Sequence, residues 1–142
     1  MKKIFFITIT LFFIIFNYPK IYAQSTPEEL MQHFFDLFEK DPSQAFDYIF
    51  STNKLIDPNQ SGIQSLKDKF ETTRKVMGNY YGYDIASKNT VGNIYVKYNY
   101  ILKYERQPIK LEVIMYKPNK IWKIQTLNFK EDFDGDFKEI KF

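Results

Sequence analysis

The sequence predicts an α+β protein in which N-terminal helices pack on a curved four-stranded antiparallel sheet. Two observations carry this prediction. Apolar residues recur at helical spacing up to about residue 77, and from Tyr80 onward they alternate with polar residues. Because the helices come first and the strands second, the helices are the only material available to cover one face of the sheet.

Three helices are expected before the period changes. The first starts at Thr26, which is followed by proline and then by Glu29, giving a capping box with proline at the first helical position. The second starts in a similar way at Asp41. The third runs from about residue 63 to 77, and Gly78 is well placed to cap its C-terminus. Their buried faces are expected to contain Leu30, Phe34, Leu37, Phe38, Ala45, Phe46, Ile49, Phe50, Leu66 and Phe70.

Four strands rich in Tyr, Ile and Val are expected at residues 80–87, 93–105, 108–117 and 120–129. Two-residue turns at 106–107 and 118–119 would place Tyr104 opposite Ile109 and Met115 opposite Trp122. A one-residue slip would exchange the two faces of the sheet, so the segregation of apolar residues supports this register. The inward face then carries Val96, Tyr98, Tyr100, Leu102, Ile109, Leu111, Val113, Met115, Trp122 and Ile124.

The first 23 residues have the layout of a secretory signal peptide. Two lysines precede the uncharged apolar run 4–16, and Ala23 supplies a small residue at the cleavage point. The run is shorter than the ~20 residues that span a bilayer, although an uncleaved anchor is the alternative. We therefore expect an exported protein, periplasmic or extracellular, with a single domain at residues 24–142 and no transmembrane segment after cleavage. The chain has no cysteine, so it is not a lipoprotein and forms no disulfide.

The charge balance argues against nucleic acid or an anionic membrane as a partner. Three of the 20 basic residues lie in the signal segment, which has no acid, so 17 basic residues face 17 acidic ones in the remainder. The stretch "YVKYNYILKYERQ" interleaves tyrosines and lysines as single-strand binders do. Alternate residues of a strand point to opposite faces, however, so most of these side chains do not meet.

The order of helices and strands, with "YYGYDIASKNTVGNIYVKYNYILKYERQPIKLEVIMYKPNKIWKIQTLNF" at 80–129, resembles the small secreted domains of the NTF2-like (cystatin-like α+β cone) superfamily. The local features are the Tyr-Gly-Tyr start at 81–83, "YERQP" at 104–108 and "YKPNKIWK" at 116–123. The resemblance covers nearly all of residues 24–142. It implies a concave face that can hold a small ligand, and it implies that some relatives are isomerases, dehydratases or hydrolases. These features carry no catalytic signature.

A small apolar or aromatic ligand is expected on the concave face. The expected pocket residues are Phe34, Phe38, Tyr98, Tyr100, Tyr104, Met115 and Trp122. The inward positions of the last three strands contain no Asp, Glu or His, so we expect a non-catalytic domain without a cofactor. The alternative is an isomerase or small hydrolase that uses Asp84 or His33 with a pocket tyrosine.

The other face of the sheet is the expected site of a protein partner or a homodimer, because apolar residues occur there on a surface that should be wet. These residues are Tyr95, Ile101, Ile114, Tyr116 and Leu127. A structural or envelope-associated protein without a ligand is a weaker alternative.

The acidic stretch "EDFDGDF" at 131–137 does not match a calcium loop. Counted from Asp132, its glycine precedes the position that the EF-hand turn requires, and the chain ends before the closing Glu. No metal site is expected. We expect a solvated tail in which Phe133 and Phe137 are more buried than Asp132, Asp134 and Asp136.

Overall fold

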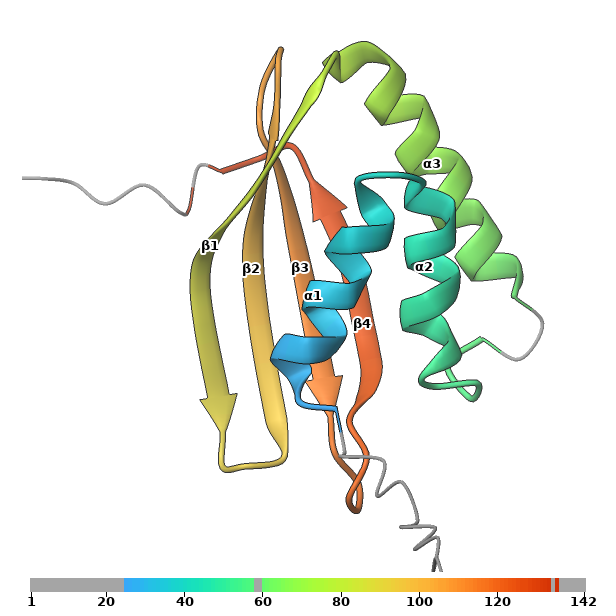
Figure 1. The fold of residues 1–142 in the computed structure, drawn as a ribbon, viewed down its shortest axis with the longest axis vertical. Coiled ribbons are helices and arrows are strands. Elements are labelled where there is room, and N and C mark those ends of the chain that lie inside the picture. Colours follow the sequence, from blue (N-terminus) through green and yellow to red (C-terminus); the bar gives the residue numbers. More distant parts are fainter. Residues whose placement is uncertain (1–24, 58–59, 134, 136–142) are drawn as a thin grey trace, which may run out of the picture.

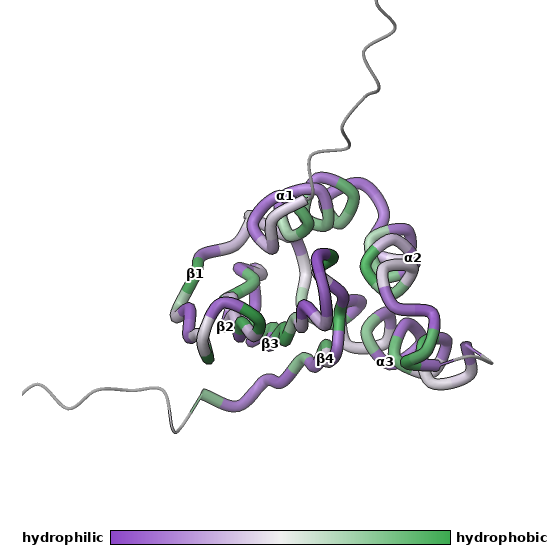
Figure 2. Tube along the Cα trace, turned by 90° about the horizontal axis from the view of Figure 1, so that it is seen from below, coloured by the Kyte–Doolittle hydropathy of each residue, from purple (hydrophilic) through white to green (hydrophobic). Residues whose placement is uncertain are grey.

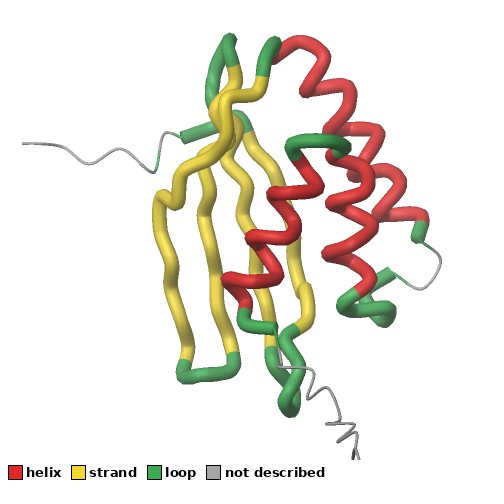
Figure 3. The backbone as a smooth tube through the Cα atoms, in the orientation of Figure 1, coloured by secondary structure: helices red, strands yellow, loops and turns green. Residues whose placement is uncertain are grey.

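The computed structural model describes residues 25–57, 60–133 and 135. Three helices, α1 (Pro27–Phe38), α2 (Pro42–Ser51) and α3 (Ser61–Met77), precede four strands, β1 (Tyr80–Val91), β2 (Tyr95–Tyr104), β3 (Ile109–Tyr116) and β4 (Lys123–Lys130). The strands form one antiparallel sheet in the order β1-β2-β3-β4, and the helices lie on one side of it (Figures 1 and 3). The predicted α+β fold is confirmed.

The helix starts follow from their capping residues. Thr26 accepts from the backbone N–H of Glu29 at 3.2 Å, and the Glu29 carboxylate accepts from the Thr26 N–H at 2.8 Å. Asp41 caps α2 by accepting from the N–H of Ser43 at 2.9 Å. The three helices form an arc over the concave side of the sheet (Figure 2).

The register between β2 and β3 differs from the predicted one by two residues. Leu102, not Tyr104, lies opposite Ile109, because the connection is longer than the two-residue turn predicted. A shift of two keeps every side chain on its own face. The predicted division of β2 and β3 into buried and outward faces is therefore retained.

The β4 register changes one assignment of face. Asn119 accepts from the N–H groups of Lys120 and Ile121, so the turn extends past residue 119, and Met115 pairs with Ile124. An irregularity follows in the β3–β4 pairing, after which Leu127 pairs with the buried Val113. Leu127 is only 5% exposed, so its predicted place on the outward partner face is wrong.

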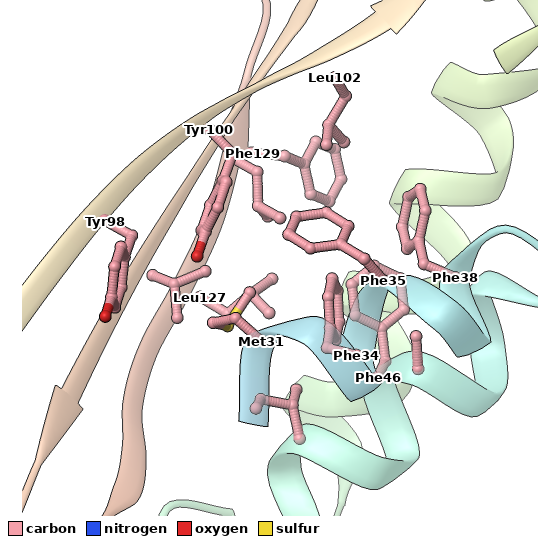
Figure 4. Packing of buried hydrophobic residues seen from close by; sticks show 14 of the residues in the cluster. Met31, Phe34, Phe35, Phe38, Phe46, Tyr98, Tyr100, Leu102, Leu127 and Phe129 are labelled. Atoms are coloured by element: carbon pink, nitrogen blue, oxygen red, sulfur yellow. The ribbon is translucent and has the colours of Figure 1, made fainter. Parts of the chain in front are cut away.

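Aromatic rings fill the space between the helices and the sheet. Phe34 of α1 is fully buried and contacts the rings of Phe35, Phe38 and Phe46. Figure 4 shows these rings between the helices and the sheet. Phe70 of α3 completes the layer. Such rings contribute large apolar areas, each stabilising by ~1.5–3 kcal/mol when buried. The core therefore provides the stability of a chain without disulfides.

The C-terminal end of α2 is bonded to the free edge of β4. The N–H of Ile124 donates to Thr52 Oγ1 at 3.0 Å, and Asn53 Nδ2 donates to the carbonyl of Ile124 at 2.7 Å. At the other end of β4, Phe133 is half-buried with Lys110 Nζ 5.6 Å from its ring centre, whereas Asp132 is exposed. Asp134, Asp136 and Phe137 lie outside the described residues.

Candidate functional site

Six of the seven residues predicted to line a ligand pocket are packed into the core. Phe34, Phe38, Tyr98, Tyr100, Tyr104 and Met115 are at most 7% exposed. Trp122 is half-buried in the turn before β4, with Lys117 Nζ 5.1 Å from its ring centre. Five surface pockets in the described part of the chain all lack Phe34, Tyr100 and Met115 from their linings, whereas Phe38 and Tyr104 border one of them, of about 270 Å³. A ligand at their position stays a prediction, and it would require these rings to separate.

The two catalytic candidates lie apart from each other and from these pockets. His33 is exposed on α1, and its ring meets the edge of Tyr48 at 4.4 Å. Asp84 is exposed on β1 and pairs with Lys103 at 3.3 Å. Neither lines any of the five pockets. The geometry therefore gives no support to the enzyme alternative, which stays a prediction.

The helix layer covers the first strand of the sheet only in part. On β1, Ile85 lies opposite the buried Tyr100 and thus faces the helix side, yet it is 59% exposed. The next residues on that face, Lys88 and Thr90, are also exposed. This uncovered inner surface of β1, with the side of α1 that borders it, forms the open flank of the fold (Figure 1).

A groove of about 410 Å³ occupies the open flank between the second half of α1 and the start of β1. We call it the aromatic groove. On α1, helical spacing places its residues on one side of the helix. On β1, the strand pairing is irregular between Tyr80 and Tyr83, and Gly82 adopts a positive φ of 94°. The lining residues are Gln32, Phe35, Asp36, Glu39, Tyr80, Tyr81, Gly82 and Tyr83.

Four of the lining residues are aromatic. Tyr83 stacks on Phe35 with 3.6 Å between ring centres, and Phe35 meets the edge of Tyr100 at 4.8 Å. Tyr81 is 61% exposed and contributes a ring at the mouth. The wall formed by Phe35 and Tyr83 is rigid because it is anchored in the core, whereas the Tyr81 ring has room to adjust.

Two carboxylates accompany these rings. Asp36 accepts from Gln32 Nε2 at 2.9 Å. Within the described ranges neither Asp36 nor Glu39 forms an ion pair, and no Lys or Arg lines the groove. The carboxylates also lie near the C-terminal end of α1, where the helix dipole is negative. The groove is therefore electronegative.

Two tyrosines of the groove, Tyr80 and Tyr83, remain neutral phenols. Burial raises the pKa of Tyr80, and the neighbouring Tyr104, Tyr83 and Glu39 raise it further. The pKa of Tyr83 is raised by burial and by the nearby Asp36 carboxylate. Because both phenols hold their protons at neutral pH, they offer aromatic faces and O–H donors and no base.

A smaller pocket of about 230 Å³ lies at the other end of α1 and contains two of the predicted pocket residues, Tyr98 and Trp122. Glu28 binds Lys88 Nζ there and accepts from the Tyr98 hydroxyl at 2.6 Å. Partial burial acts to raise the pKa of Glu28, but the hydrogen bonds from Lys88 and Tyr98 outweigh it and lower the pKa to about 2. Such a group stays ionised at neutral pH and is unsuited to acid–base catalysis.

The predicted partner face retains four of its five residues. Tyr95, Ile101 and Ile114 are half-buried and Tyr116 is 39% exposed. The rings of Tyr95 and Tyr116 are 5.7 Å apart. The ion pair between Lys97 and Glu112 at 2.5 Å is formed on the same face, so the apolar residues there do not form a continuous patch.

Sequence reasoning missed the aromatic groove because the pairing of the first strand is irregular. The available signal was the Tyr-Tyr-Gly-Tyr stretch at 80–83, where a glycine interrupts an otherwise regular strand. Alternation alone could not show which tyrosines face the helices, since each extra residue in a strand reverses the faces that follow.

Comparison with known proteins adds no relative. No protein-family model matches the chain, no curated protein matches it, and no solved structure matches it. Among the described residues, no group of three or more His, Asp or Glu side chains is arranged to hold a metal ion. No helix in the described ranges combines the length and the apolar character needed to cross a lipid bilayer.

Proposed function

We propose that the protein is an exported, non-catalytic NTF2-like domain that binds a small organic cation with an apolar body, such as a quaternary ammonium compound, in the aromatic groove. The observation that carries this proposal is the combination of four aromatic rings with two carboxylates that lack an ion-pair partner within the described residues.

The chemistry of the groove favours a cation over a neutral or anionic molecule. Ring faces attract cations through their quadrupole, by ~0.5–1 kcal/mol at exposed sites. The carboxylates add a Coulomb attraction, which is modest near the surface because water screens it. Two ring contacts of this size supply ~1–2 kcal/mol and each carboxylate at most ~1 kcal/mol, so we expect a dissociation constant on the order of 1 mM or weaker.

The same features support binding rather than catalysis. The two tyrosines whose pKa is raised, Tyr80 and Tyr83, cannot accept a proton near neutral pH. His33 does not line the groove. A ligand would be held by ring faces and carboxylates.

The proposal is tested by titrating the exported chain, purified after secretion, with choline and with its neutral isostere 3,3-dimethylbutan-1-ol. Two-dimensional amide NMR follows both titrations. We expect shifts at residues 32–39 and 80–83, and an affinity for choline at least about tenfold higher than for the neutral compound, which corresponds to ~1.4 kcal/mol.

Two tyrosine variants provide the matched comparison. Tyr81→Ala removes a ring of the groove and should weaken choline binding, whereas Tyr116→Ala removes an exposed ring on a different strand and should not. Equal affinity for choline and its isostere, or unchanged binding in Tyr81→Ala, would contradict the proposal.

A further inference from the structure

The turns at one end of the sheet form a single surface. The N–H of Lys117 in the β3–β4 turn donates to the carbonyl of Ile94 in the β1–β2 turn at 2.8 Å. The loop after α2 joins them through the bonds of Thr52 and Asn53 to Ile124. We call this surface, made of residues 52–55, 91–95 and 116–123, the hairpin end. It lies at the bottom of Figure 1 and faces the viewer in Figure 2.

Exposed apolar side chains are concentrated on the hairpin end. Of the eight large hydrophobic residues exposed in the described part of the chain, five belong to it. Half-buried rings of Tyr95 and Trp122 lie beside them. Turns are normally built from small and polar residues, and clustered exposed apolar residues mark an interaction surface. The five exposed residues are Leu55 (82%), Val91 (71%), Ile94 (46%), Tyr116 (39%) and Ile121 (56%).

The charge on this end is positive. Four lysines lie within it, and a fifth, Lys88, borders it on β1 and pairs with Glu28. Two other nearby carboxylates are held at helix starts. Glu29 accepts from the N–H of Thr26 before α1, and Asp57 accepts from the N–H of Ile63 at the start of α3. The four lysines are Lys54, Lys117, Lys120 and Lys123.

The opposite end of the sheet has the reverse character. The end of α1, the β2–β3 connection and the segment after β4 contain more acids than bases. The near balance of acidic and basic residues in 24–142 therefore does not extend to the hairpin end, where no acid accompanies the four lysines. Up to residue 133, the acidic residues of the three segments are Asp36, Glu39, Asp41, Glu105, Glu131 and Asp132, and the basic ones are Lys40 and Arg106.

The chain enters the domain at the hairpin end. Helix α1 begins at Pro27, next to Lys88 and Trp122 in the small pocket. The hairpin end combines exposed apolar side chains with four lysines and contains no acid. This combination favours an anionic bilayer as the occupant over a protein partner.

We propose that the hairpin end rests on the surface of an anionic lipid bilayer. Leu55, Val91, Ile94 and Ile121 enter the headgroup boundary, and the lysines contact anionic headgroups. Tyr and Trp are the residues that accumulate at this depth, and lysine stems extend their charges toward the headgroups. In this orientation the aromatic groove, at the far end of α1, remains open to the aqueous side. The inference does not depend on what the groove binds.

Vesicle flotation tests the proposal with the exported chain purified after secretion. Vesicles of phosphatidylcholine alone are compared with vesicles containing phosphatidylglycerol, at low and high salt. Because Trp122 is the single tryptophan of the chain, its emission reports directly on the hairpin end. We expect binding to the anionic vesicles, a shift of the emission to shorter wavelength, and weakening by salt.

Two double variants separate the apolar and the charge contributions. Lys117→Gln with Lys120→Gln should weaken binding to anionic vesicles by about thirtyfold. Val91→Asn with Ile121→Asn should abolish the shift in emission. The control is Val76→Asn, which changes an exposed apolar residue (57%) on α3, and which should bind like the unchanged chain. Circular dichroism verifies that every variant is folded.

The outcomes distinguish this inference from the proposed function. Tyr81→Ala should keep vesicle binding, and Val91→Asn with Ile121→Asn should keep choline binding. The membrane assignment would be overturned by equal binding to both vesicle types, or by a loss of vesicle binding in Val76→Asn as large as in Val91→Asn with Ile121→Asn. It would also be overturned if the unchanged chain self-associates and Val91→Asn with Ile121→Asn abolishes that association.

Discussion

Strands β1 and β2 are neighbours in one sheet, yet their inner faces have opposite environments. Every inward residue of β2 from Val96 to Tyr104 is at most 7% exposed. On β1, the residue opposite buried Tyr100 is Ile85, which is 59% exposed. The difference shows that α1 covers β1 only in part, since Tyr83 stacks on Phe35 whereas Ile85 stays exposed. The aromatic groove lies at the start of β1, where the strand meets the second half of α1.

The largest expected effect tests whether stability resides in the covered part. Phe34→Ala removes a fully buried ring from the centre of the helix layer and should lower the free energy of unfolding by ~3–5 kcal/mol. Ile85→Ala, on the open flank, should lower it by less than about 0.5 kcal/mol. Urea denaturation measures both. Similar losses in the two variants would mean that β1 is packed more closely than its exposure indicates.

The junction between the two regions is expected to be intolerant of a side chain. Gly78 joins α3 to β1 with φ 79° and ψ −151°, and an added Cβ would lie 2.8 Å from Glu105 Oε2. Gly78→Ala should therefore destabilise by ~2 kcal/mol or more. Gly92→Ala is the matched control, because the φ of Gly92 is 55° and no atom lies within 4 Å of the added Cβ. This variant should lower the free energy of unfolding by about 1 kcal/mol. Equal melting temperatures for the two variants would contradict this reading of the junction.

The smallest expected effect concerns the attachment of α1 to the flank. The pKa of Glu28 is about 2 in the folded protein against an ordinary value of 4.5. Because the pKa is lowered in the folded state, the ionised carboxylate stabilises the folded protein at pH values above the ordinary pKa. This stabilisation is lost as the pH falls from about 4.5 toward 2. Its size is about 1 kcal/mol or less, because the Glu28 side chain is 53% exposed and solvent screens the pair.

The measurement is the free energy of unfolding between pH 5 and 2.5, compared with Glu28→Gln. The variant should show a shallower loss of stability on acidification and a lower stability at the upper end of the range. If the two curves run parallel, Glu28 does not hold α1 on the flank through its charge.

Most of the fold was predictable because it rests on local signals. The Thr26 and Asp41 caps and the glycine at 78 all lie where the structure has helix ends. The inward residues of β2 and β3 were assigned correctly even though the register was off by two, since an even shift preserves the face. Leu127 was misplaced because the irregularity before it reverses the faces of the rest of β4.

The candidate site was less predictable for the same physical reason. The sequence placed the ligand among Phe34, Tyr100 and Met115, where aromatic residues are densest. Density of aromatic residues indicates a core as readily as it indicates a pocket, and here the rings of α1 fill the space. The open aromatic surface lies instead at 80–83, where no periodicity predicts which way a side chain points.

The sequence by itself determined the helix ends, the change from helices to strands and the apolar face of the sheet, because capping and alternation act within a few residues along the chain. The tertiary structure decided which aromatic residues are covered, because coverage depends on the width of the helix layer relative to the sheet. It also decided that residues far apart in sequence, from Leu55 to Trp122, form one basic and apolar end. Such a surface arises only when the turns are brought together by the register of the strands.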